Sequence, residues 1–342
     1  MNMQYGFRNE FVDGQYTGSR FRMDQMRFEI KGKVTDKVYF RFRNRYTSEP
    51  IPQSEDHVSR AVDIAMIRVD LSPKWSLSAG KLCADFGGFE FDLNPIDIYE
   101  YADILEQADN FLAGAGVSYR LNKNNEFNFQ VLNSRTKSFQ ELYGIQPGIV
   151  EAKTALAYVA NWRGSLFGGK IKTIWSYSLF NEAENTHMSY VALGQQYVAK
   201  KFSLAYDFQI SDENLDRTGI VSSTIPDSLY PYAAHKTLYT SHWVKADYRL
   251  SKKINLSFVG YADYANWTDT KDPQKKGDEV RTAYGFIPTI ELYPFDNVNL
   301  RFFANWVGRK YEYSDYSKSR FGSKDYTTGR FVIGFVTPLL IL

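Results

Sequence analysis

Residues 202–210 read FSLAYDFQI, and their side chains alternate between apolar and mostly polar along the whole stretch. One parity holds Phe, Leu, Tyr, Phe and Ile, and the other holds Ser, Ala, Asp and Gln. Successive side chains of a β-strand point to opposite faces, whereas a helix has a longer period. The stretch therefore predicts a β-strand with one apolar face and one mostly polar face.

The same period-two pattern recurs at 170–179, 244–250 and 299–306. Tyr, Phe and Trp gather on the apolar parities near the predicted strand ends, where a membrane interface places an aromatic belt. The polar parities carry Lys and Arg at strand centres, which a water-filled lumen tolerates and lipid does not. Both features favour a transmembrane β-barrel over the soluble β-sandwich that alternation alone would also allow.

The composition fits a barrel in the bacterial outer membrane. The chain has 342 residues, 25 Tyr, 25 Phe and a net charge of +2. No stretch approaches the roughly 18–20 apolar residues of a spanning helix, so a membrane protein of this sequence must be a closed barrel. Cys83 is the single cysteine, which excludes an internal disulfide. Residues 1–16 contain charges and no apolar signal-peptide segment, so we interpret them as mature sequence.

The connections alternate between short turns and longer polar loops, as in outer-membrane barrels. The predicted turns are 34–37, 72–74, 122–125, 167–169, 199–201, 251–253 and 294–297. The predicted loops are 13–18, 49–59, 84–110, 135–150, 182–186, 212–236, 268–278 and 313–325. These connections predict an all-β antiparallel barrel of sixteen strands, with fourteen or eighteen as alternatives, in a single domain over 1–342. Sixteen strands leave an aqueous lumen, so we expect a pore for small hydrophilic solutes or ions.

A basic wall is predicted inside the early strands. Arg41, Arg43 and Arg45 alternate with two phenylalanines that would face lipid. Together with neighbouring strands they give a set that shares the lumen face: Arg8, Arg20, Arg22, Arg27, Arg41, Arg43, Arg45 and Lys81. A change of parity between Asp24 and Arg27 places a β-bulge near 25–26. The wall is either an anion track, since guanidinium groups bind phosphate and carboxylate, or a solvated surface neutralised by Glu10, Asp24 and Glu29.

The third long loop, 84–110, is strongly acidic. It contains eight carboxylates and no Lys or Arg: Asp85, Glu90, Asp92, Asp97, Glu100, Asp103, Glu106 and Asp109. Loops of this length are uncommon unless functional or disordered, so we expect a constriction loop that folds into the lumen opposite the basic wall. A short helix over 96–105 after Pro95, capped by Asn94, is also predicted. The alternatives are an extracellular lid, or a calcium site at Glu90, Asp92 and Asp97 that matches no EF-hand spacing.

Other classes of function find little support. The histidines (His57, His187, His235, His242) show no spacing typical of a catalytic or metal site, so no enzyme activity and no cofactor is expected. The first strand starts near residue 3, which leaves no room for the plug of a hydrophobic-substrate transporter. A plugged or structural barrel that acts with partner proteins stays open as the alternative function. Nucleic acid is not expected as a partner.

Gly80-Lys81 at the end of the fifth strand, Phe86-Gly87 at the start of the third loop, and the arginine alternation resemble the phosphate-selective porin O and P family. The resemblance implies a trimeric, sixteen-stranded porin whose third loop folds into the channel, among outer-membrane lipid and lipopolysaccharide. It also implies that lumen cations draw anions to the constriction, here Arg22, Arg27, Arg41, Arg43 and Lys81. The chain departs from that family in its acidic third loop and in its outer lysines Lys271, Lys275 and Lys276, which lie among three aspartates. It also ends with Leu342 and not with the aromatic residue that usually closes a barrel sequence.

Overall fold

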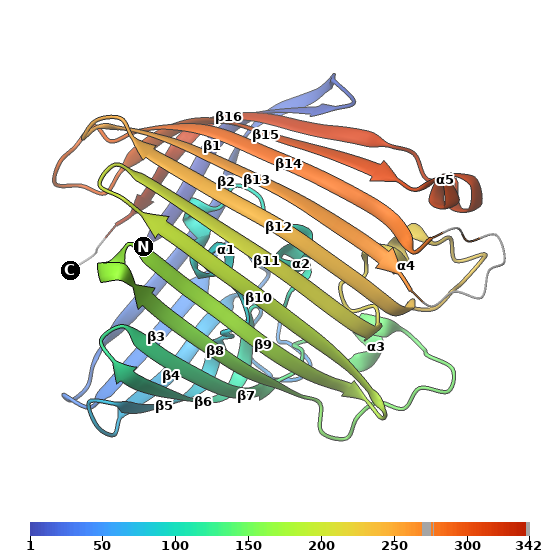
Figure 1. The fold of residues 1–342 in the computed structure, drawn as a ribbon, viewed down its shortest axis with the longest axis horizontal. Helices are drawn as coiled ribbons and strands as arrows, with labels where there is room; N and C mark the ends of the chain where they lie inside the picture. Colours follow the sequence, from blue (N-terminus) through green and yellow to red (C-terminus); the bar gives the residue numbers. More distant parts are fainter. Residues whose placement is uncertain (269–274, 276, 340–342) are drawn as a thin grey trace.

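The computed structural model describes residues 1–268, 275 and 277–339. In this part of the chain, sixteen antiparallel strands form a closed barrel in which each strand pairs with its sequence neighbours and β1 pairs with β16 (Figure 1). The strands are β1 (Asn2–Val12), β2 (Gln15–Lys33), β3 (Val38–Arg45), β4 (Val62–Asp70), β5 (Trp75–Cys83), β6 (Phe111–Asn122), β7 (Asn125–Asn133), β8 (Leu156–Leu166), β9 (Ile171–Ala183), β10 (Thr186–Val198), β11 (Phe202–Leu215), β12 (His235–Arg249), β13 (Ile254–Trp267), β14 (Glu279–Leu292), β15 (Arg301–Tyr313) and β16 (Tyr326–Pro338).

The prediction of a sixteen-stranded antiparallel barrel is confirmed, and the alternatives of fourteen and eighteen strands are wrong. The first loop is shorter than predicted, because Asp13 and Gly14 adopt positive φ angles of 49° and 75° and close β1 and β2 with two residues. Of the seventh loop, 268–278, most lies outside the described residues, as do Lys271, Lys276 and Leu342. Lys275 is described, and its Nζ lies 2.7 Å from a carboxylate oxygen of Asp278.

The two faces of the strands are inverted relative to a soluble protein. In β11 the side chains of Asp207 and Gln209 are fully buried, while Leu204 and Tyr206 on the other parity are each 39% exposed. Polar groups therefore point into the barrel and apolar groups point out of it, so the soluble-sandwich alternative is wrong. No helix among the described residues is long and apolar enough to cross a membrane.

The bulge in β2 lies one residue before its predicted place. Gln4 of β1 pairs with Gln25 while Tyr5 pairs with Met23, so the extra residue is Asp24. A bulge sets two residues of one strand against one of the other, which brings both Asp24 and the following lumen-facing residues to the inner face. Alternation in the sequence shows that the parity changes but does not identify which residue is extra.

The two ends of the barrel differ. Both termini lie at the end of the short turns, which include the 3-10 turn η2 (Phe167–Gly169) (Figure 1). The longer loops lie at the opposite end and carry α3 (Phe139–Tyr143), α4 (Ile220–Thr224) and α5 (Asp315–Phe321). Outer-membrane barrels place short turns in the periplasm and long loops outside, which orients this chain in the membrane.

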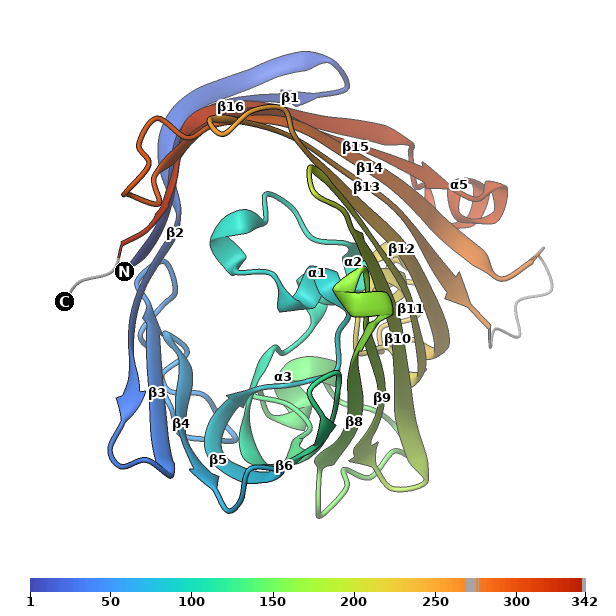
Figure 2. The ribbon, with the colours of Figure 1, turned by 60° about the vertical axis from the view of Figure 1, so that its left-hand side comes forward.

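The third loop, 84–110, lies inside the ring of strands (Figure 2). It carries α1 (Phe89–Asp92) against β10 and β11, η1 (Pro95–Asp97) against β1, β2 and β16, and α2 (Asp103–Gln107) against β12. The single helix predicted for 96–105 is therefore wrong. Ile98 and Ala102 have extended backbones, and the Ala102 N–H donates to the carboxylate of Glu90 instead of continuing a helix. Asn94 does cap η1, accepting the Ile96 N–H at 3.4 Å.

Candidate functional site

A cavity of about 1240 Å³ lies between the third loop and the wall formed by β1 to β4. Fourteen Lys or Arg side chains and nine Asp or Glu side chains line it among the described residues. Since Arg and Lys keep their charge at neutral pH, this count leaves the cavity with a surplus of positive charge. The cavity is the candidate functional site.

Seven of the eight predicted wall residues line this cavity: Arg8, Arg22, Arg27, Arg41, Arg43, Arg45 and Lys81. The register explains why they share a face, because Arg27 pairs with Arg45 across β2 and β3 and Lys31 pairs with Arg41. Directly opposed residues of antiparallel strands point to the same side of the sheet. Arg20 does not line the cavity, since it lies near the outer tip of the β1–β2 hairpin and pairs with Glu10.

The wall is not a row of free cations. Arg8 pairs with Asp24, and the Arg41 Nε lies 2.7 Å from a Glu29 carboxylate oxygen, as the solvated-surface interpretation allowed. Lys81 Nζ lies 2.7 Å from an Asp56 oxygen. Four of the seven are buried: Arg8, Arg27, Arg43 and Lys81. The side chains of Arg22, Arg41 and Arg45 are 57%, 32% and 31% exposed, so these three are the accessible cations of the predicted wall.

Asp63 neutralises much of the wall, and the sequence analysis missed it. Its buried carboxylate lies 2.8 Å from Nε of Arg27, 3.2 Å from Nε of Arg43 and 3.4 Å from Nε of Arg45. By alternation Asp63 belongs to the lipid-facing parity of β4, but a register shift opposite residues 43 and 44 turns it inward. A lone carboxylate on a parity that should face lipid was the signal that could have found this bulge.

Gly80 explains how Lys81 reaches the lumen. Lys81 has the parity of Leu77, which is 45% exposed on the outer face, yet its side chain lines the cavity. Gly80 has φ of +119°, and a Cβ there would lie 2.2 Å from the Ala65 carbonyl oxygen. Only glycine permits this backbone and this approach of β5 to β4. The Gly-Lys pair noted in the sequence thus has a steric basis.

Most carboxylates of the third loop pair with arginines on strands outside the basic wall. Asp85 and Asp92 both bind Arg163 of β8, at 3.2 and 2.9 Å. Asp97 binds Arg301 of β15. These contacts compensate the loop's charge on the side away from the basic wall. The sequence analysis placed this acidic loop opposite the basic wall, but these carboxylates pair with arginines of other strands.

A second group of contacts holds the middle of the loop. Asp103 binds both Arg281 of β14 and Arg309 of β15. Glu100 lies 2.7 Å from Arg330 of β16. Arg281 and Arg330 are each the one arginine of their strand, and Arg309 shares β15 with Arg301 eight residues away, so no close alternation like that of β3 marked them. The alternation of β14 to β16 places them in the lumen, but only the path of the loop shows which carboxylates they meet.

Glu90 serves the interior of the loop rather than the cavity. Its side chain is fully buried and accepts hydrogen bonds from the Ala102 N–H at 2.8 Å and from Gln209 Nε2 at 3.3 Å. Asp207 of β11 accepts the Phe89 and Glu90 N–H groups at 3.0 and 2.7 Å. These bonds fasten α1 to β11. Burial raises the pKa of the Glu90 carboxyl well above its usual range.

The calcium alternative brought together Glu90, Asp92 and Asp97. The structure separates them, because Glu90 binds a backbone amide while the other two bind Arg163 and Arg301. No group of three or more His, Cys, Asp or Glu within 1–268, 275 and 277–339 could hold a metal ion.

We expect the docking of the loop to depend on pH through Glu90. The docked carboxyl has a raised pKa, so it holds its proton more tightly than the undocked one. Docking is then strongest below the ordinary Glu pKa and weakens as pH rises through the raised value. Glu90→Gln should remove this dependence and slow exchange of the Ala102 amide several-fold at neutral pH, because the amide oxygen still accepts that N–H. Hydrogen exchange, corrected for intrinsic rates at each pH, measures the effect.

The control for this prediction is Glu141→Gln in α3, an exposed carboxylate far along the chain that should leave the Ala102 amide unchanged. Faster exchange of that amide in Glu90→Gln, or an unchanged pH profile, would show that the charged carboxylate holds the loop.

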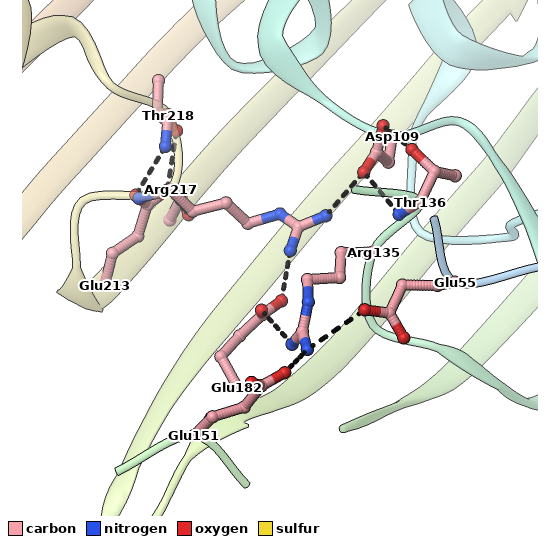
Figure 3. Close-up of polar contacts among 10 residues, drawn as sticks. Glu55, Asp109, Arg135, Thr136, Glu151, Glu182, Glu213, Arg217 and Thr218 are labelled. Carbon is pink, nitrogen blue, oxygen red and sulfur yellow. Dashed lines mark hydrogen bonds and ion pairs between the residues drawn. The ribbon is translucent and has the colours of Figure 1, made fainter. Parts of the chain in front are cut away.

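A polar network ties the outer end of the third loop to its neighbours (Figure 3). Asp109 accepts from the Thr136 N–H and hydroxyl, both at 3.1 Å, and lies 3.3 Å from Nη2 of Arg217. Arg217 and Arg135 both bind Glu182 at the end of β9, the latter at 3.0 Å. The second, fourth and sixth loops also meet here, through Glu55, Glu151 and Thr218. No local pattern in the sequence indicates this network.

The family model described as phosphate-selective porin O and P matches residues 1–335. The chain belongs to this family. Similar solved structures include the outer-membrane channel DcaP of Acinetobacter baumannii (TM-score 0.64, 9% identity, covering 98% of this chain and 96% of DcaP). OmpT of Vibrio cholerae, folded in vitro in its trimer form, has a TM-score of 0.56 and 9% identity, with 98% of each chain covered. Salmonella typhi OmpF in complex with daunomycin has a TM-score of 0.57 and 13% identity, covering 97% of this chain and 96% of OmpF.

No curated protein sequence shows a significant match to the chain. At these identities the solved structures establish the fold alone, and the family assignment carries the functional class. Membership of the porin O and P family supports an outer-membrane channel in an outer-membrane location. It also suggests a channel without enzymatic activity.

Proposed function

We propose that this porin O and P family member is a passive diffusion pore for small hydrophilic solutes that favours anions. Solutes pass between the basic wall of β1 to β4 and the third loop, 84–110, which acts as the constriction. The charge of the cavity carries the proposal, because its lining holds fourteen cationic and nine acidic side chains. Since many of these are paired with each other, the expected anion preference is modest.

Accessible cations follow the cavity from end to end. Arg60 and Lys137 lie in the outer loops, Arg22 and Arg41 lie on the wall, and Lys31 lies near the periplasmic end of β2. Among the described residues, Arg60, Lys137 and Lys31 have no ion pair within 4 Å, so they can exchange an anion along the path. Guanidinium groups fork onto phosphate or carboxylate oxygens and keep their charge at every relevant pH.

Neutralising the accessible wall tests this proposal. In planar bilayers under a KCl gradient, Arg22→Gln/Arg41→Gln/Arg45→Gln should shift the reversal potential toward cation selectivity. Each change removes one positive charge, and Arg41→Gln also leaves the Glu29 carboxylate without its arginine partner. Arg20→Gln/Arg120→Gln/Lys310→Gln removes three exposed cations that do not line the cavity and should leave the potential unchanged. Equal shifts in both variants would refute a role for the wall.

The same recordings address the rival function and the solute. A plugged barrel that acts with partner proteins would give no stable single-channel steps. Phosphate specificity requires that phosphate at low concentration reduces the chloride current, and no reduction would leave a general anion pore. We further propose a homotrimer, as for the OmpT form above, in contact with lipopolysaccharide. Analytical ultracentrifugation, in a solvent whose density matches that of the detergent, measures the mass of the protein oligomer.

A further inference from the structure

The short turns of the barrel carry a ring of lysines that the pore does not use. Six of the seven turns, at 34–37, 71–74, 123–124, 167–170, 199–201 and 250–253, contain at least one lysine. The residues are Lys37, Lys74, Lys123, Lys170, Lys200, Lys201, Lys252 and Lys253. Asp36 is the one acidic residue in these six turns, and the seventh turn, 293–300, has Asp296 and no lysine. The periplasmic rim is therefore strongly positive.

The opposite end of the barrel does not share this charge. Apart from the third loop, the outer loops carry fourteen Asp or Glu and eleven Lys or Arg. All eight turn lysines are exposed, and within the described part of the chain none has an ion pair. None of them lines the main cavity either. A set of unpaired cations at one end of a membrane protein indicates an anionic surface at that end.

Each lysine-bearing turn is also flanked by an exposed apolar side chain. These are Val34 at 68% exposure, Leu71 at 55%, Leu121 at 45%, Phe167 at 75%, Tyr197 at 46% and Leu250 at 51%. The apolar band of the barrel thus continues up to the turns, and the lysines follow it directly. Lysine stems lie along apolar surface while the ammonium group reaches the polar boundary. In a bilayer this arrangement would bring the ammonium groups to the level of the lipid phosphates.

We infer that this ring binds the phosphate groups of anionic phospholipids in the periplasmic leaflet. The distribution of the lysines decides between this partner and others. They are spread over six consecutive turns around the barrel, and lipid surrounds a barrel on all sides, whereas a soluble acidic protein would contact one patch. The inference concerns the rim, so it does not depend on which solutes cross the pore.

Lipid selectivity tests the inference. The full-length protein is reconstituted in vesicles of phosphatidylglycerol and phosphatidylcholine, with one or the other brominated, and quenching of tryptophan emission gives their relative binding. Trp75, which is 46% exposed beside Lys74, is a suitable reporter. One lysine near an anionic surface favours the charged lipid by about fivefold at low salt, so a preference of that order is expected. The preference should fall with added salt.

Two matched variants complete the test. Lys74→Gln/Lys123→Gln/Lys170→Gln/Lys201→Gln should bring the preference close to equality. Lys153→Gln/Lys310→Gln/Lys318→Gln/Lys324→Gln removes the same charge from the outer side and should keep it. Single-channel conductance equal to that of the unmodified protein verifies folding in both. The inference is overturned by a wild type without preference, by equal losses in both variants, or by a rim variant that alters ion selectivity while lipid preference persists.

Discussion

Deleting residues 89–103 and joining the ends with a short Gly-Ser linker should raise single-channel conductance several-fold and make the pore strongly anion-selective. The segment contains α1, η1 and the start of α2, all of which lie inside the barrel. Its removal takes away five carboxylates and no Lys or Arg. Arg281 and Arg330 then lose their loop carboxylates and become unpaired, whereas Arg301 and Arg309 keep Glu291 and Asp263. Planar-bilayer conductance and reversal potential measure both effects.

The control deletes α5 (Asp315–Phe321), which packs on β14 and β15 and does not line the cavity. That variant should conduct like the unmodified protein. Unchanged conductance after removal of 89–103 would place the constriction elsewhere. Higher conductance without a gain in anion selectivity would mean that other groups neutralise the freed arginines.

Replacing Asp63 by Asn should be among the most destabilising single changes on the basic wall. The buried carboxylate faces Arg27, Arg43 and Arg45, and its loss leaves these three arginines without their ion-pair partner. Breaking a buried ion pair by removing one partner costs about 3–5 kcal/mol. Unfolding by urea in lipid vesicles, with the slope of the transition checked for constancy, measures this loss.

Asp70→Asn is the matched control on the same strand. Its partner Arg68 lies 3.1 Å away, and both side chains are more than a third exposed, at 36% and 42%. Exposed pairs contribute about 1 kcal/mol or less, so this variant should unfold almost like the wild type. If the two variants unfold alike, Asp63 is not the anion that holds the wall together.

The strand order, the turns and the lumen face were predictable because they depend on neighbours in the sequence. Side-chain parity and turn-forming residues are local properties, and stretches such as 202–210 state them directly. Prediction failed where a bulge changes the parity by one residue. The bulge at Asp24 was placed one position too late and the bulge at Asp63 was missed, since alternation shows a change of parity but does not identify the extra residue.

The candidate site was half predictable. The cationic side was found from alternation, and seven of its eight residues line the cavity. The pairing between the lumen arginines and the loop carboxylates was not predicted, because Arg281 and Arg309 are separated from their partner Asp103 by more than 170 positions. The same holds for the network around Glu182, whose members come from five separate segments. Which residues form such ion pairs depends on how the barrel closes and on the path that the loop takes through it.

The amino-acid sequence by itself determined that this chain is a sixteen-stranded barrel with a basic inner wall and a long acidic third loop. Side-chain periodicity and turn-forming residues extend over a few positions, so both can be recognised in the sequence without knowledge of the fold. Only the tertiary structure decided which charges remain accessible. Charge compensation depends on distances across the lumen, and these exist only once β1 meets β16 and the loop crosses between them.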